Sequence, residues 1–316
     1  MKLNNTQLIN FKERIKFSDE DKKYYQPQID NLISSIQSKI DEHTDTTVKK
    51  VLQAGSWRKG TIIKRMDDKP IDIDLVFFLD IDFSNYATFQ DINNLMIPIL
   101  KKIYPQKNDE DFWNNPKTAG LEFISSGLNV DIVPVRETNV ADYVQQPDAH
   151  NNNHFTSPKN QLQFISDRKA ANTNFTTIVR ILKKWKNYHG IGLSSFAIEL
   201  IVSYLDIKIG VENSIEESIL RFFKLVSKKQ FPVITFNAPY GTYKPDYSHI
   251  YIADPTYNEN NVTKYLTEVE WKLIKLRASN ALDTLCLADE EEYLIPTIEL
   301  WKEIFGNSFN IDPVTK

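Results

Sequence analysis

In the first part of the chain, the spacing of apolar residues is that of a helix followed by a strand. Between residues 19 and 40, apolar side chains recur at steps of three and four, which is the period of an amphipathic helix. Segment 47–53 (TVKKVLQ) is short and rich in β-branched residues, and Gly55 follows it closely. The pattern therefore predicts one long helix, then a strand that ends in a turn.

Two later segments alternate as strands do. Segment 71–78 (IDIDLVFF) alternates apolar and acidic residues at its start, and segment 128–135 (LNVDIVPV) alternates throughout. A helical period over residues 91–103 lies between them. These elements predict a mixed sheet backed by helices.

The second half of the chain is helical in pattern, and the whole predicts an α+β fold. A polar, Asn-rich stretch at 145–158 predicts the connection between two lobes and the rim of an active site. We expect a catalytic lobe with a mixed sheet over residues 1–155 and a mainly α-helical lobe over residues 156–316. The helices expected in the second lobe cover residues 174–188, 194–205, 215–228 and 269–287.

Composition narrows the classes of function. The chain has 38 basic and 42 acidic residues, a formal net charge of -4, so no global positive field attracts a nucleic acid and a strong nucleic-acid footprint is not expected. The single Cys286 excludes an internal disulfide framework and a Cys-based zinc cluster. No apolar run approaches the ~18 residues of a membrane span, so we expect a cytoplasmic protein with small charged ligands.

Three acidic residues lie on the two predicted strands. Asp72 and Asp74 are two residues apart, so a strand places both side chains on one face, and Asp131 lies on the second strand. Carboxylates this close are unfavourable unless a cation neutralises them, and Mg²⁺ prefers oxygen ligands. Three acids on adjacent strands can hold two Mg²⁺ (or Mn²⁺) ions roughly 3.5–4 Å apart, as in phosphoryl transfer.

The alternative for an isolated D-x-D pair is a solvated strand edge, because exposed acids are common. Here Ile71, Ile73 and the run from Leu75 to Phe78 flank the acids. This context predicts a buried central strand, in which unpaired carboxylates would be costly.

A Gly-Ser turn precedes the acidic strand. Gly55 lets the backbone approach a phosphate closely, and Ser56 offers a hydroxyl beside the N–H groups of a following helix. Arg58 and Lys59 add positive charge, as do Lys64 and Arg65. Triphosphate binding is the predicted use, although a lone Gly-Ser turn can also be an ordinary connection.

The order QAGSWRKGT, DIDLVFF, VDIVPV resembles the DNA polymerase beta-like nucleotidyltransferase superfamily, whose signature is a Gly-Ser turn, a D-x-D strand and a third acid. Within it, the chain looks like the oligoadenylate synthase and cyclic GMP-AMP synthase branch, and most like the bacterial CD-NTases of anti-phage CBASS systems. RILKKWKNYHGIGLSSFAIELI resembles the second-lobe helix pair of that branch, and IADPTYNENNV resembles its Asp-Pro plus Asn-Asn-Val element.

The resemblance assigns roles to single residues. It implies that Gly55 and Ser56 bind the donor triphosphate, and that the three acids bind magnesium. It also implies that Lys183, or Lys184 in its place, and Ser195 reach the donor phosphates. Both lysines can equally form a solvated helix face.

Other polar and aromatic residues receive weaker assignments. Asp254 and Asn261 are expected to hold a loop rather than act in catalysis. Three aromatic residues are candidates to stack on bases, although core or rim positions are more common for such residues. A metal pair of His150 and His154 is rejected, because a spacing of four has no meaning in a loop. The aromatic candidates are Tyr143, Phe155 and Tyr247.

The function implied is template-independent nucleotide transfer. An acceptor ribose hydroxyl attacks the α-phosphorus of an NTP (ATP, GTP or a pyrimidine NTP), pyrophosphate leaves, and a second round closes a cyclic di- or trinucleotide. A regulatory partner or a downstream cyclic-nucleotide effector is implied as well. Two alternatives stay open: a linear oligoadenylate or RNA-tailing enzyme, which the slight acidity disfavours, and a non-catalytic nucleotide-binding regulatory protein, which the three acids disfavour.

Overall fold

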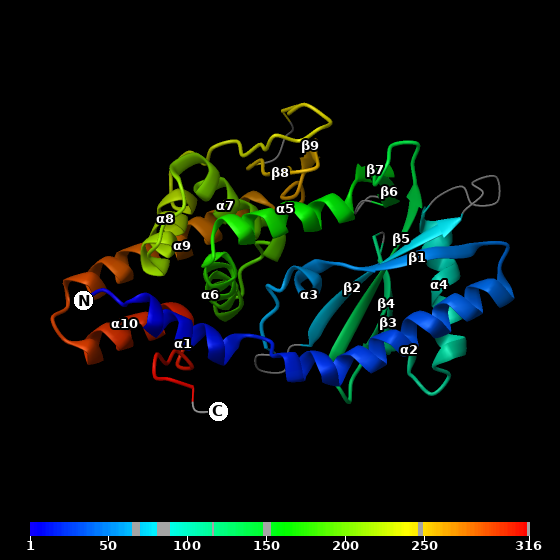
Figure 1. Cartoon of the computed structure of the whole chain (residues 1–316), viewed down its shortest axis with the longest axis horizontal. Coiled ribbons are helices and arrows are strands. Elements are labelled where there is room, and N and C mark those ends of the chain that lie inside the picture. The colour runs from blue at the N-terminus through cyan, green and yellow to red at the C-terminus, as the bar shows by residue number, and fades with distance from the viewer. Residues whose placement is uncertain (65–69, 81–88, 116, 148–152, 246–248, 315–316) are drawn as a thin grey trace. The chain divides into compact units, whose positions relative to one another are not determined.

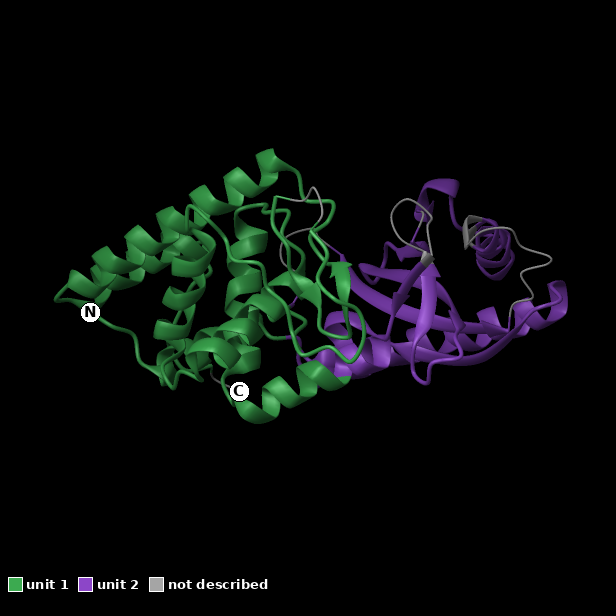
Figure 2. Ribbon diagram, turned by 90° about the horizontal axis from the view of Figure 1, so that it is seen from above, with its two compact units in different colours: residues 1–16, 61–63, 163–316 green, residues 17–60, 64–162 purple. Residues whose placement is uncertain are grey.

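The computed structural model describes residues 1–64, 70–80, 89–115, 117–147, 153–245 and 249–314. They divide into two compact units, coloured separately in Figure 2. Both units are discontinuous in sequence, because residues 1–16 and 61–63 belong with the C-terminal half of the chain. The sheet unit comprises Phe17–Gly60 and Lys64–Leu162, and the helical unit comprises Met1–Lys16, Thr61–Ile63 and Gln163–Lys316.

The sheet unit is built on a mixed sheet with the strand order β1-β2-β5-β4-β3 (Figure 1). The neighbours β2 and β5 are parallel, and the other pairs are antiparallel. A hairpin of β6 and β7 extends from β5. The strands are β1 (Thr47–Gln53), β2 (Ile71–Asp80), β3 (Phe112–Asn114), β4 (Ala119–Phe123), β5 (Leu128–Glu137), β6 (Val144–Pro147) and β7 (Asn153–Thr156).

Strand β2 lies between β1 and β5, which confirms the prediction of a central strand. Ile73 and Leu75 are fully buried on one face, while the opposite face carries Asp72, which is exposed, and Asp74, which is half-buried. Further along this second face, Val76 and Phe78 join a small apolar core with Val135 and Val144. The acid face therefore opens to water at Asp72, so the burial cost expected from the sequence does not apply there.

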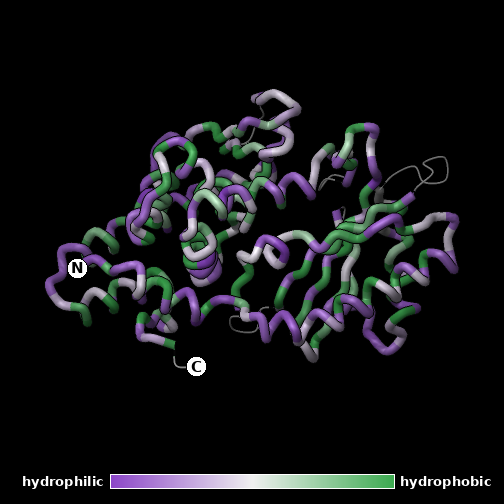
Figure 3. The backbone as a smooth tube through the Cα atoms, viewed as in Figure 1, coloured by the Kyte–Doolittle hydropathy of each residue, from purple (hydrophilic) through white to green (hydrophobic). Residues whose placement is uncertain are grey.

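Two helices cover one face of this sheet. Helix α2 (Asp19–His43) packs against β1 and α4 (Phe89–Ile103), and α4 packs against β3, β4 and β5. Helix α2 begins at a capping box between Ser18 and Asp21, and the side chains that it buries recur at steps of three and four. In Figure 3, hydrophobic and hydrophilic bands of colour alternate along this helix. The buried residues of α2 are Ile29, Leu32, Ile36 and Ile40.

The helical unit has a core centred on Trp185 of α6 and Trp301 of α10, both fully buried. Helix α1 packs against α6 and α8, so the N-terminal segment is part of this core. A short β8–β9 ladder completes the unit. Its elements are α1 (Asn5–Ile15), α5 (Pro158–Ala171, which starts in the sheet unit), α6 (Phe175–Tyr188), α7 (Ser195–Ile209), α8 (Ile215–Val226), β8 (Ala253–Asp254), β9 (Tyr257–Asn261), α9 (Glu268–Glu290) and α10 (Leu294–Phe305).

The structure confirms the predicted α+β class and adds elements that the pattern missed. Helices α1, α5 and α10 were not predicted. The stretch at 145–158, expected to be a connection, contains the β6–β7 hairpin, whose entry is fixed by Tyr143 stacking on Phe155 with centroids 4.7 Å apart. Among the described residues, no helix combines the length and the apolar content needed to cross a membrane.

Candidate active site

The three predicted acids share one face of the sheet. In the parallel register of β2 and β5, Asp74 is the Cα partner of Asp131, and Asp72 is the partner of Asn129. Paired residues of adjacent strands point to the same side, and residues two apart on one strand do as well. The backbone therefore brings Asp72, Asp74 and Asp131 to one patch, as predicted.

Gly55 closes the patch on its β1 side. The Ala54 N–H donates to the Asp74 carbonyl at 2.8 Å, which holds the turn against β2. Gly55 has φ +58°, and a Cβ built on it would overlap the Asp74 carboxylate. Position 55 therefore requires glycine twice over, once for its left-handed backbone and once for the approach to Asp74.

Asp131 is held from the other side. The Trp113 indole N–H and the Thr118 hydroxyl both donate to Oδ1 of Asp131, each at 2.9 Å. Neither residue was among the sequence candidates, because they lie outside the alternating strands and their contact with Asp131 depends on the sheet register. The sequence around Trp113 and Thr118 has no motif that indicates this role, because both residues lie near the turn between two short strands.

The chemistry of these ligands suits magnesium, although the side chains do not form a ready cluster. Within the described part of the chain, no three Asp, Glu, His or Cys side chains are close enough to hold a metal ion as they stand. Facing carboxylates repel one another without a cation, and one oxygen of Asp131 is engaged by Trp113 and Thr118. Three carboxylates in adjacent register still make the oxygen-only ligand set that Mg²⁺ prefers.

The Gly-Ser turn leads into a short helix, α3 (Gly55–Lys59), as predicted. Its Trp57 is buried and packs on Phe17 with ring centroids 5.2 Å apart, which anchors the helix in the sheet unit. Ser56 lies in the first turn and is half-buried. Of the predicted basic residues, Arg58 and Lys64 are exposed, Lys59 is buried, and Arg65 lies outside the described residues.

In the helical unit, Lys183 is a buried residue of α6. Its Nζ donates to the Thr61 carbonyl at 2.9 Å, and the Thr61 hydroxyl donates to Glu199 of α7 at 2.6 Å. Lys184 is buried too, with its Nζ 6.0 Å from the ring centroid of Tyr188. The solvated-face alternative for these two lysines is therefore wrong.

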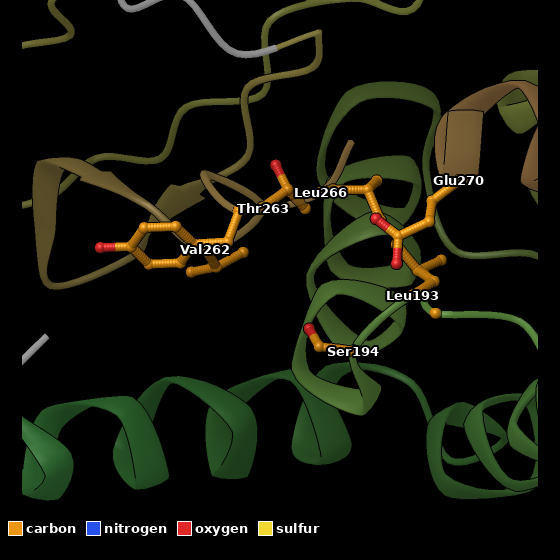
Figure 4. Close-up of a pocket in the computed structure, with 8 residues that line it drawn as sticks. Leu193, Ser194, Val262, Thr263, Leu266 and Glu270 are labelled. Atoms are coloured by element: carbon orange, nitrogen blue, oxygen red, sulfur yellow. The ribbon is translucent and has the colours of Figure 1, made fainter. Parts of the chain in front are cut away.

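Ser195 is the first residue of α7 and is half-buried. The helix cap is the neighbouring Ser194, whose hydroxyl accepts the Ala197 N–H at 3.0 Å. A cavity of about 180 Å³ lies beside this helix start (Figure 4). In the figure, the Glu270 carboxylate reaches toward Leu193 and Leu266. The lining residues are Gly192, Leu193, Ser194, Val262, Thr263, Tyr265, Leu266 and Glu270.

The remaining candidates have structural contacts. Asp254 accepts both the N–H and the hydroxyl of Thr256, each at 2.8 Å, as expected of a loop-structuring residue. Asn261 bonds to the backbone of Ile250 and Ile252 and to Thr263. Tyr143 is buried and stacks on Phe155, so both serve the β6–β7 hairpin. Tyr247 and His150 lie outside the described residues, and His154 lies in β7.

Comparison with known proteins identifies the family. A model of the Second Messenger Oligonucleotide or Dinucleotide Synthetase domain matches residues 1–169. The CBASS oligonucleotide cyclase CdnC of Escherichia coli strain KTE188 is 33% identical over 318 residues, which cover 99% of each chain. The chain belongs to the second messenger oligonucleotide or dinucleotide synthetase family. The predicted membership of this nucleotidyltransferase branch is thus confirmed.

Solved structures share the fold of this synthetase. The structure of E. coli MS115-1 CdnC with ATP has a TM-score of 0.81 at 24% identity, and covers 98% of this chain and 99% of that one. The complex of the same enzyme with HORMA-deltaN has a TM-score of 0.79 at 24% identity, with 98% of each chain covered. The predicted nucleotidyltransferase lobe with a helical second lobe is therefore confirmed as the fold.

Proposed function

We propose that this synthetase joins NTPs into a cyclic di- or trinucleotide second messenger for anti-phage signalling. The observation that carries the proposal is the register of Asp74 opposite Asp131, with Asp72 on the same face and Gly55 against Asp74. The full-length similarity to a CBASS oligonucleotide cyclase supports the cyclic product.

The reaction forms one bond and breaks one. The acceptor ribose oxygen bonds to the α-phosphorus of the donor NTP, the α–β phosphoanhydride bond breaks, and pyrophosphate leaves. Asp72, Asp74 and Asp131 would hold two Mg²⁺ (or Mn²⁺) ions, which when bound neutralise phosphate charge and lower the pKa of the acceptor hydroxyl. Asp131 accepts the hydroxyl proton, and Gly55 and Ser56 bind the triphosphate.

The proposal also gives phosphate-binding roles to residues of the helical unit. Ser195 and one of the two buried lysines, Lys183 or Lys184, bind phosphate oxygens. Because Lys183 donates to the Thr61 carbonyl, its use for phosphate would add a contact to an ammonium group that has three donors.

A protein partner and an effector complete the proposed signalling. The CdnC enzyme of E. coli MS115-1 forms a complex with HORMA-deltaN. By analogy, this synthetase is regulated by a protein partner, and its product is sensed by a downstream effector.

The test is product analysis with a matched pair of variants. Purified protein is incubated with mixed NTPs and Mg²⁺ or Mn²⁺, treated with phosphatase, and analysed by mass spectrometry. A phosphatase-resistant cyclic product is expected, while a linear product would support the oligoadenylate or tailing alternative. Asp72→Asn should abolish product, and Asp80→Asn, at the exposed end of the same strand, should retain it. Turnover by Asp72→Asn, with its melting temperature unchanged, would refute the metal assignment.

A further inference from the structure

A tryptophan reaches the Asp131 carboxylate from two strands away. Asp131 on β5 pairs with Gly120 on β4, and Gly120 in turn pairs with Trp113 on β3. Adjacent strands lie about 4.8 Å apart, so the Trp113 backbone stands ~10 Å from that of Asp131. The indole Nε1 nevertheless donates to Oδ1 at 2.9 Å. The indole must therefore cross the middle strand of this row.

Gly120 makes that crossing possible. It is buried, and a Cβ built on it would overlap the Trp113 indole ring. Any side chain at position 120 would push the ring away from Asp131. The glycine in the middle of the row thus leaves the space that the indole occupies.

Thr118 supplies a second donor to the same oxygen. It directly precedes β4, and its turn is fixed by reciprocal backbone hydrogen bonds between Asn115 and Thr118, at 2.8 and 3.2 Å. Its hydroxyl donates to Oδ1 of Asp131 at 2.9 Å. A carboxylate oxygen has two lone-pair sites, so Trp113 and Thr118 occupy both on Oδ1. Oδ2 is left to bind other partners.

We propose that Trp113 and Thr118 are positioning residues, which fix the rotation of the Asp131 carboxylate so that Oδ2 is the oxygen available to a cation. The proposal rests on the proposed function, in which Asp131 is a metal ligand. Both donors are neutral, so the carboxylate keeps its charge while losing rotational freedom. Removing such an outer hydrogen bond typically costs about 10- to 100-fold in metal affinity or activity.

Five variants separate positioning from general stability. Thr118→Val and Trp113→Phe each remove one donor and keep most of the side-chain shape, and Gly120→Ala displaces the indole with both donors intact. Each should lower kcat and raise the half-saturating Mg²⁺ concentration by about 10-fold or more, with little change in KM for NTP. Thr118→Ser should restore both values. Thr47→Val, an exposed threonine on β1, is the matched control and should behave as wild type.

Binding of Tb³⁺ alone gives a readout that needs no turnover. Terbium luminescence excited through tryptophan should report weaker Tb³⁺ binding in Thr118→Val than in Thr118→Ser or wild type. If Thr118→Val and Trp113→Phe lose melting temperature but keep wild-type Mg²⁺ dependence, and Thr118→Val keeps wild-type Tb³⁺ affinity, the contacts are merely structural and the proposal is overturned. If wild type makes no product in any NTP mixture or with candidate activators, while Thr118→Val still binds Tb³⁺ more weakly, the proposed function fails and the positioning role stands.

Discussion

Gly55 and Gly60 offer a matched pair of substitutions that tests the approach of the Gly-Ser turn to Asp74. Both glycines have left-handed backbones, with φ +58° and +71°; Gly55 is the first residue of helix α3 and Gly60 caps its end. A Cβ at position 55 would overlap the Asp74 carboxylate, whereas a Cβ at position 60 meets nothing within 4 Å. The two alanine variants thus share backbone strain and differ in the displacement of one acid.

The strain of an alanine in the left-handed region is about 1–2 kcal/mol, so both variants should lose a similar stability, seen as a melting temperature lower by a few degrees. In Gly55→Ala the Asp74 carboxylate must also move by ~1 Å or more, and a misplacement of that size costs on the order of 100-fold in rate. Pyrophosphate release should therefore fall about 100-fold in Gly55→Ala and stay near wild type in Gly60→Ala.

The assay pairs pyrophosphate release under saturating NTP with thermal unfolding of the same samples. Gly55→Ala turning over at the wild-type rate would refute the reasoning, because the overlap with Asp74 would then carry no consequence. An equal loss of activity in Gly60→Ala would refute it as well, since strain without displacement would then suffice.

Two further predictions concern the helical unit. Burial raises the pKa of Glu216 to about 7, against the opposing hydrogen bond from the Leu3 N–H. The folded state therefore holds the Glu216 proton more tightly than the unfolded chain does. The stability that this tighter binding contributes is present at low pH and is lost as the pH rises from the ordinary glutamate pKa of 4.5 toward 7. Glu216→Gln should raise the melting temperature more at pH 8 than at pH 5, and an equal effect at both pH values would contradict the assignment. Asn261→Ala should lower the free energy of unfolding by about 1–3 kcal/mol, because the N–H groups of Ile252 and Thr263 both lose the Asn261 side-chain oxygen as their acceptor. A loss below ~0.5 kcal/mol in chemical denaturation would show that the loop does not need Asn261.

Local pattern was enough to find the strands that carry the acids. Alternation over 71–78 and 128–135 reports which residues of one segment face the same side, and β2 and β5 follow it. The same holds for the Gly-Ser turn, since a strand ending at glycine and a following short helix are both local features. The order of these motifs along the chain was also sufficient to identify the family.

Short elements were not predicted from the sequence, because they contain too few residues for a hydrophobic period to be recognised. Strand β3 has three residues and β4 has five, which is too few for alternation to be recognised. The pairing of these two strands places Gly120 between Trp113 and Asp131. Helix α1 was missed although its buried residues Leu8, Phe11 and Ile15 have helical spacing, because a helix of 11 residues shows only a short run of that period.

What the sequence by itself determined is the identity of the chemical groups and the strand face on which each one lies. Only the tertiary structure decided which groups meet: Gly55 against Asp74, Trp113 and Thr118 on Asp131, and Lys183 on Thr61. Periodicity describes what a single segment buries, whereas strand register and hydrogen bonds between distant segments depend on how the whole chain packs. The Thr61–Glu199 bond joins residues 138 positions apart, a distance over which no local pattern carries information.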